Sequence, residues 1–317
     1  MGPDATLVAS RLTIEAIMRG VDLLYELAEG NIAHGMVASA LWCFRLSESA
    51  APRTSLILPS VWNESGSIHG LARALEMPYP TVHRHLTALA RRGMVVRNPA
   101  GRFTISPGLV NSRVGQRFCS RAFASASRFI VGLHRIGDVN GDIIAFQRNG
   151  GLSIAQQDAV FRAYLEILLV NLQLTARSYS DLTIGLVFNF VATANIKHLT
   201  ELPADTSGFL PDEMRRPISV YRVAKSLHVP YETVRRITRR LLDRNVFEQV
   251  GDQGVIVPGR SLRTSVDPAI AVESNRSIAD GIRQIQLAGV PISFCVKLLT
   301  RSESYLSERR STGWGYA

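Results

Sequence analysis

The sequence predicts a mainly α-helical chain with two units of the order helix, turn, helix and β-hairpin, set among longer scaffold helices. Two observations predict this fold class. Apolar residues recur at helical spacing over most of the chain. In addition, residues 67–92 align without a gap on residues 219–244, and ten of the 26 pairs are identical. Chance would give about one or two identities, so we expect an internal duplication.

The first copy begins with Ser67, which can cap a short helix. A turn follows, and Pro80 suits the first turn of a second helix. Gly93 is the glycine expected at the end of that helix. A strand over residues 94–97 and a second over residues 102–105 then form a hairpin around an Asn-Pro-Ala-Gly turn.

The second copy repeats these signals. Ser219 takes the capping position, the second helix runs over residues 232–244, and the hairpin occupies residues 246–257. In both copies an alanine, Ala72 or Ala224, lies where the first helix crosses the second closely. This order of elements is that of a winged helix-turn-helix unit, in which the hairpin is the wing.

The two predicted winged units divide the chain into two halves. An N-terminal half, residues 1–136, contains a winged unit at residues 66–110. A linker at residues 137–153 leads to a C-terminal half, residues 154–317, with a winged unit at residues 214–262. Scaffold helices that pack the halves together are predicted over residues 6–29, 31–48, 113–136, 155–178, 181–198 and 268–289.

The stretch from Leu75 to Val95 contains Pro78, then Thr81-Val82-His83-Arg84, and then leucines before an arginine-rich helix end. It resembles the helix-turn-helix motif of IclR-type transcriptional regulators, and more loosely that of MarR-type regulators. The resemblance covers the two winged units, under a third of the chain, and implies DNA binding. Pro80 and Glu232 stand where these regulators usually carry a small hydroxyl residue. No ligand-binding domain of the IclR type follows, so no effector is implied.

Positive charge is concentrated in the two winged units. The chain has 36 basic and 26 acidic residues, a net charge of +10. Residues 66–110 hold six basic residues and one acidic residue, and residues 214–263 hold eleven and four. The rest of the chain therefore has a net charge of −2. Such a distribution is typical of a nucleic-acid-binding surface.

In a winged helix-turn-helix the second helix enters the major groove. Arg84 and Arg236 match the arginine of the IclR-like pattern and can bind guanine or phosphate through two hydrogen bonds. The outward residues that we expect to contact DNA are Tyr79, Thr81, His83, Arg84 and Thr87 in the first copy, and Tyr231, Thr233, Arg235, Arg236 and Arg239 in the second.

The wings differ in charge. Arg97 and Arg102 flank the first wing and are candidates for contact with the DNA backbone or minor groove. The second wing has Glu248 and Asp252 instead, so we expect it to contribute less. Four arginines near helix ends can serve either DNA or the helix dipole. These are Arg91, Arg92, Arg240 and Arg244.

Other chemistry is not indicated. His83 and His85 point to different faces of a helix, which argues against a metal site. Cys43, Cys119 and Cys295 are far apart and odd in number, which favours free thiols in a reducing cytoplasm. No phosphate-binding loop or catalytic arrangement is recognisable, so we expect neither a cofactor nor enzymatic activity.

These observations predict a bacterial, cytoplasmic and nucleoid-associated regulator of transcription. It would bind double-stranded DNA through two unequal recognition helices in one chain, as a pseudo-dimer. Two alternatives stay open. Plasmid-type replication initiators also carry tandem winged helices, and a protein-interaction scaffold would offer its basic faces to an acidic partner.

Three further expectations concern ligands and assembly. The apolar side chains of Trp42, Phe44, Phe188 and Phe190 are interpreted as core, although they would also suit an effector pocket. A homodimer in which each chain uses one helix-turn-helix stays open. No membrane association is expected, because the most apolar stretch, residues 184–196, is too short to span a bilayer.

Overall fold

The computed structural model describes residues 3–49, 66–99, 101–135, 152–199, 210–265 and 267–290. In the N-terminal half the elements are α1 (Pro3–Leu27), α2 (Ile32–Ser49), α3 (Ile68–Ala74), α4 (Tyr79–Arg91), β1 (Val95–Arg97), β2 (Phe103–Ile105), α5 (Pro107–Asn111) and α6 (Arg113–Arg135). In the C-terminal half they are α7 (Ile154–Tyr179), α8 (Leu182–Ile196), η2 (Asp212–Met214), α9 (Val220–Leu227), α10 (Tyr231–Asp243), β3 (Glu248–Val250), β4 (Gly254–Ile256), α11 (Gly259–Ser265) and α12 (Pro268–Leu287).

The mainly helical fold class with two small hairpins is confirmed. Each hairpin is an antiparallel pair, β1 with β2 and β3 with β4, and the described residues contain no larger sheet. The two capping serines take their expected places, since Ser67 accepts a hydrogen bond from the amide of Gly70 and Ser219 from that of Arg222. The expected linker lies almost entirely outside the described residues.

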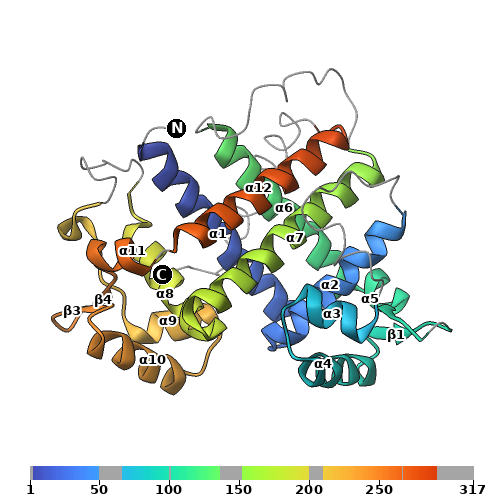
Figure 1. Cartoon of the computed structure of the whole chain (residues 1–317), viewed down its shortest axis with the longest axis horizontal. Coiled ribbons are helices and arrows are strands. Elements are labelled where there is room, and N and C mark those ends of the chain that lie inside the picture. The colour runs from blue at the N-terminus through green and yellow to red at the C-terminus, as the bar shows by residue number, and fades with distance from the viewer. Residues whose placement is uncertain are drawn as a thin grey trace, which may run out of the picture.

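The centre of the molecule is a crossing of α1 and α7 (Figure 1). A β-carbon on Gly20 would lie 2.4 Å from a methyl group of Leu168, so glycine allows the two helices to approach closely. One turn earlier, the hydroxyl of Tyr164 donates to the carbonyl of Ala16 at 2.9 Å. Because the helices cross, α1 leads to α3 and α4 on one side, and α7 leads to α9 and α10 on the other.

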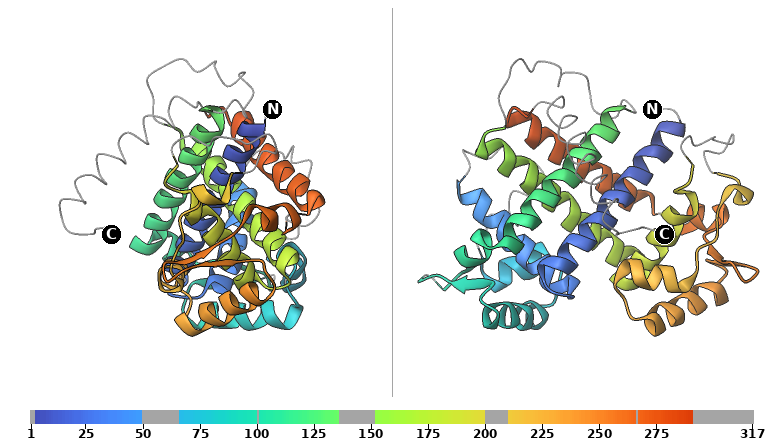
Figure 2. Two further views of the ribbon diagram at one scale, coloured as in Figure 1. Left: turned by 90° about the vertical axis from the view of Figure 1, so that its left-hand side faces the viewer. Right: turned by 180° about the vertical axis from the view of Figure 1, so that it is seen from behind.

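Each helix-turn-helix packs on the second scaffold helix of its own half. In the N-terminal half α2 contacts α4 and β2, and in the C-terminal half α8 contacts α9, α10 and β4. Glycines let these scaffold helices lie against the preceding ones. A β-carbon on Gly35 would meet the carbonyl oxygen of Leu24 at 2.4 Å, and one on Gly185 would meet a methyl group of Thr175 at 2.4 Å. In the view from behind, α6 lies alongside α1 and packs against it (Figure 2).

α7 is the core helix of the fold. Among the described residues, α7 is the one helix that is long and apolar enough to cross a membrane. However, 78% of its most apolar stretch is buried inside the protein. The sequence instead singles out residues 184–196, which form most of the shorter α8. The burial of α7 accounts for its hydropathy without a bilayer.

The aromatic residues and cysteines support the interpretation as core. Trp42, Phe44 and Phe188 are buried, and Phe190 packs partly buried against the same cluster. Cys43 and Cys119 are free thiols, while Cys295 lies outside the described residues. Burial raises the pKa of Cys43 well above its ordinary value and that of Cys119 to about 11. Both thiols are therefore protonated at neutral pH and poor nucleophiles.

Candidate nucleic-acid interface

α4 owes its outward face to a regular apolar stripe. Val82, Leu86 and Leu89 are buried against the scaffold, so the residues between them face outward. The helix begins at Tyr79 after Pro78, one residue before the expected start. It ends where Gly93 adopts a φ of +67°, in the left-handed region that favours glycine.

The expected contact residues of α4 form a partly exposed surface. Tyr79 is 42% exposed, and His83 and Arg84 are exposed as well. The Tyr79 ring lies 4.6 Å from that of His69 and 6.4 Å from that of His83, centre to centre. Thr81 is half-buried, and so is Thr87, whose hydroxyl donates to the carbonyl of His83 at 2.9 Å. The hydroxyl proton of Thr87 is therefore already engaged within the helix.

α10 presents a more basic surface. Tyr231 is 50% exposed, Arg236 and Arg239 are exposed, and Thr233 is half-buried. Arg235 lies half-exposed beside them. Its guanidinium donates to both carboxylate oxygens of a neighbour in the first turn, at 2.8 and 2.7 Å.

That neighbour is Glu232, so Arg235, an expected DNA contact, is already ion-paired within the helix. The hydrogen bonds from Arg235 lower the pKa of the Glu232 carboxyl, so both groups are charged at neutral pH and the pair is neutral overall. The spacing of three residues on a helix is one at which opposite charges meet. The sequence therefore held the signal for this pair.

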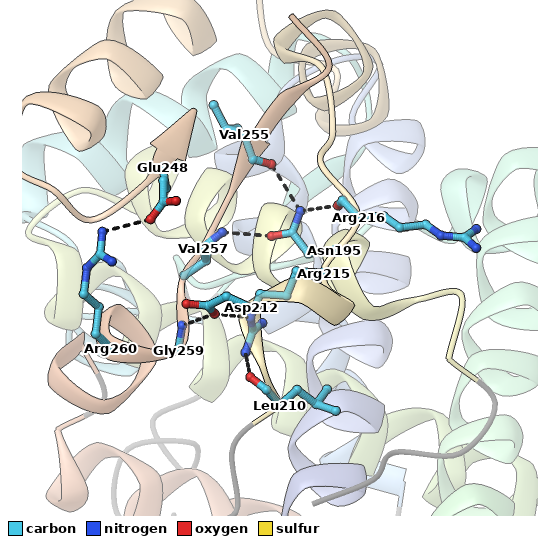
Figure 3. A network of polar contacts seen from close by, with 10 residues as sticks. All are labelled: Asn195, Leu210, Asp212, Arg215, Arg216, Glu248, Val255, Val257, Gly259 and Arg260. Atoms are coloured by element: carbon cyan, nitrogen blue, oxygen red, sulfur yellow. Dashed lines mark hydrogen bonds and ion pairs between the residues drawn. The ribbon is translucent and has the colours of Figure 1, made fainter. Parts of the chain in front are cut away.

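The two wings are held differently. In the first, Nε of Arg97 donates to the carbonyl of Gly101 at 2.9 Å, and its guanidinium lies 5.8 Å from the centre of the Phe103 ring. Arg102 is exposed and directly precedes β2. In the second wing, Glu248 pairs with Arg260 of α11 at 3.1 Å (Figure 3).

Some of the basic residues in these units make contacts that hold the fold together, although Arg92 among them stays exposed. Arg92 donates to the carbonyl of Ala28 at 3.0 Å and pairs with Glu29 at 2.5 Å, which anchors the end of α4 to the end of α1. Arg215 is buried, and its Nε lies 2.9 Å from Asp212. The charge counted along the sequence therefore exceeds the charge that faces solvent.

A buried asparagine fixes the second winged unit to its scaffold (Figure 3). The amide nitrogen of Asn195, near the end of α8, donates to the carbonyls of Arg216 and Val255 at 2.7 and 3.2 Å. Its oxygen accepts from the amide of Val257 at 2.9 Å. One side chain thus holds both the segment before α9 and the wing. Nothing in the local sequence marks Asn195 for this role.

His85 faces inward and is 8% exposed. Its ring lies 4.9 Å from that of His34 on α2, edge to face. Burial lowers the pKa of both imidazoles, and Arg84 lowers them further. Among the described residues no group of three or more metal-ligating side chains occurs. The pair is therefore a packing contact behind the outward face of α4.

The two outward faces lie on the same side of the molecule. α4 and α10 run along the lower edge of Figure 1, one under each half, and the wings project from the two outer ends. The view from behind shows the same arrangement (Figure 2). A single elongated ligand along this edge would meet both helices and both wings.

A family model of the IclR helix-turn-helix domain matches residues 63–99. This range holds α3, α4 and β1, so it confirms the IclR-like resemblance for the first winged unit. The family is one of DNA-binding transcriptional regulators and is not enzymatic. No curated protein and no solved structure matches the chain. Residues 63–99 of the N-terminal half are therefore similar to an IclR-type helix-turn-helix domain, and α4 is the second helix of that motif.

Proposed function

We propose that this protein is a sequence-specific regulator of transcription that binds one stretch of double-stranded DNA with α4 and α10 together. The observation that carries the proposal is that these two helices lie on the same side of the molecule (Figure 1) and carry matching exposed residues. Tyr79 and Arg84 of α4 correspond to Tyr231 and Arg236 of α10 in the repeat, and all four are exposed.

The order of elements supports a duplication of the whole half, with residues 1–136 and residues 154–317 as the two copies. Each half has two long helices, a helix-turn-helix with a wing, a short helix and a long final helix. The final helix packs on the first long helix in both halves, α6 on α1 and α12 on α7. Homodimeric regulators place two copies of one subunit on DNA. Here one chain supplies both.

The two recognition helices are unequal, so we expect an asymmetric, two-part binding site. α4 presents the exposed His83 and Arg84, and α10 presents the half-exposed Arg235 and the exposed Arg236 at the equivalent positions. Different side chains at the base edges recognise different bases. The DNA site should therefore lack the twofold symmetry of a homodimer's operator.

Selection from a random double-stranded DNA pool by the full chain tests the proposal. We expect enrichment of a bipartite sequence with unequal halves, bound at least about a thousandfold more tightly than scrambled DNA. A salt series should give a log–log slope that indicates several phosphate contacts, about 0.9 per contact. Failure to enrich any sequence would contradict sequence-specific binding.

Other outcomes of the selection would identify the alternatives. A perfect palindrome would show that two chains each use one helix-turn-helix, as in a homodimer. Equal and weak binding to all DNA would favour an acidic protein as the partner of the basic faces. DNA upstream of the protein's own gene is a natural first candidate sequence for the comparison with scrambled DNA.

A further inference from the structure

We infer that the two winged units bind DNA by different routes: the first adds a minor-groove contact through its wing, and the second relies on α10 in the major groove. This inference rests on the proposed function and specifies how each half of the site is bound. It starts from a charge difference between two hairpins that correspond residue by residue.

The hairpins have opposite charge. Residues 94–105 contain two arginines and no acidic residue, and the equivalent residues 246–257 contain two acidic residues and no basic one. Arg97 of the first hairpin is replaced by Gln249 in the second. A wing with a charge of +2 is attracted to the phosphates that border the minor groove. The carboxylates of the second wing are repelled by them, Asp252 most, because Glu248 is paired with Arg260.

The side chain of Arg97 is held in place before any DNA arrives. Its hydrogen bond to the carbonyl of Gly101 uses Nε, and the guanidinium lies over the Phe103 ring. An arginine has five N–H donors, so four are left for a ligand. Ordering the side chain in advance reduces the entropy lost on binding.

The second wing is organised around its acidic side chains. Glu248 forms an ion pair with Arg260 of α11. The side-chain amide of Gln249 donates a hydrogen bond to the backbone carbonyl of Gly251 at 2.7 Å. Asp252 is exposed in the turn at the tip. A carboxylate at the tip would meet phosphates first if this wing entered a groove. The second wing therefore stays outside the minor groove.

The recognition helices show the reverse difference. Thr87 and Ala88 of α4 correspond to Arg239 and Arg240 of α10, both exposed. Arginine is the side chain that most often recognises guanine in the major groove. α10 therefore offers Arg236, Arg239 and Arg240 on its exposed face, whereas α4 offers Arg84 and, in its last turn, Arg91.

The DNA sequence preferred at each end follows from these differences. An arginine in the minor groove favours the narrow groove of A·T-rich DNA, because its negative potential is enhanced. The wings project outward from the two ends of the molecule (Figure 1). We therefore expect an A·T-rich flank outside the α4 half of the site, and guanines within the α10 half.

Footprinting of the full chain on the selected DNA tests this inference. Hydroxyl-radical protection reports the minor groove, and interference by methylation of guanine N7 reports the major groove. We expect minor-groove protection outside the α4 half alone, and the stronger guanine interference in the α10 half. Arg97→Ala and Arg102→Ala should each abolish part of that protection and weaken binding about tenfold.

The control is Gln249→Ala at the equivalent position of the second wing, which should change affinity less than twofold. Equal minor-groove protection at both ends, or an equal loss from Gln249→Ala, would overturn the inference while leaving sequence-specific binding intact. If selection enriches no sequence, the proposed function fails, and the inference fails with it.

Discussion

Oε2 of Glu76 lies 3.3 Å from Nε of Arg177, and this ion pair joins the turn of the first helix-turn-helix to α7 of the other half. His228 lies in the corresponding turn of the second helix-turn-helix, and Tyr25 lies on α1. The rings of Tyr25 and His228 stack with their centres 4.2 Å apart. Two contacts of different chemistry therefore cross between the halves, one from each turn.

These contacts relate the positions of the two recognition helices. Each turn rests on the first long helix of the opposite half, and both turn residues, Glu76 and His228, adopt a left-handed φ of 50° and 54°. The side-chain amide of Gln173 on α7 also donates a hydrogen bond to the backbone carbonyl of Ala74 in α3. Together with the crossing of α1 and α7, they join the two halves that carry α4 and α10.

A double-mutant cycle on Glu76→Ala and Arg177→Ala measures the first of these contacts. Both side chains are close to half-exposed, 47% and 44%, so we expect a coupling energy of about 0.5 kcal/mol in urea denaturation. Arg177 also pairs with Glu273 at 2.8 Å. Arg177→Ala should therefore destabilise the protein more than Glu76→Ala does. A coupling energy of zero would show that the pair does not hold the halves together.

Arg84→Ala and Arg236→Ala should each weaken binding to the selected DNA by about 1–3 kcal/mol, because each removes a guanidinium from an outward helix face. A gel-shift titration measures the loss. Arg276→Ala is the matched control, since Arg276 is exposed on α12, and this helix does not lie along the lower edge of Figure 1 with α4 and α10. Equal losses in all three variants would mean that net charge matters and not position.

Local signals predicted most of the elements. Long apolar periodicity placed the scaffold helices, and the turn residues placed the hairpins, because both depend on neighbours in sequence. The crossing of α1 and α7 could not be predicted. It depends on Gly20 and Leu168, whose partnership no local pattern encodes.

The candidate interface was harder to predict than the fold. Arg215 counts as a basic residue in sequence, but the structure buries it beside Asp212. Whether a charge faces solvent depends on tertiary packing, which a charge count ignores. Arg235 differs, because its helical spacing from Glu232 already indicated an ion pair.

Gly35→Ala should destabilise the protein by about 2–3 kcal/mol, as expected for overpacking of a tight helix contact. The added β-carbon would lie 2.4 Å from the carbonyl oxygen of Leu24, which is backbone and cannot move aside. Thermal or urea denaturation measures the effect. Gly108→Ala is the control, since its β-carbon would meet the Ser106 hydroxyl at 3.3 Å on an exposed helix. A stability loss no larger than that of the control would disprove the close contact of α1 with α2.

The stability of the protein should fall as the pH drops from 7 to 5. His34 and His85 have folded pKa values lowered from 6.5, first by burial and then by neighbouring positive charge. The positive charges of Arg92 and Arg84 lower the pKa of His34. Those of His34 and Arg84 lower the pKa of His85. Between the lowered pKa and 6.5 the unfolded chain binds more protons than the folded one, so acid favours unfolding.

His85→Ile isolates this contribution, because the second half has Ile237 at the equivalent position. Urea denaturation at pH 7 and at pH 5 should show a smaller loss of stability in the variant than in the parent. Burial raises the pKa of Asp22 and Asp158 above 3.8, which acts in the opposite direction but is common to both proteins. It therefore cancels in the comparison. An identical pH dependence in parent and variant would mean that His85 is not held neutral by the packing behind α4.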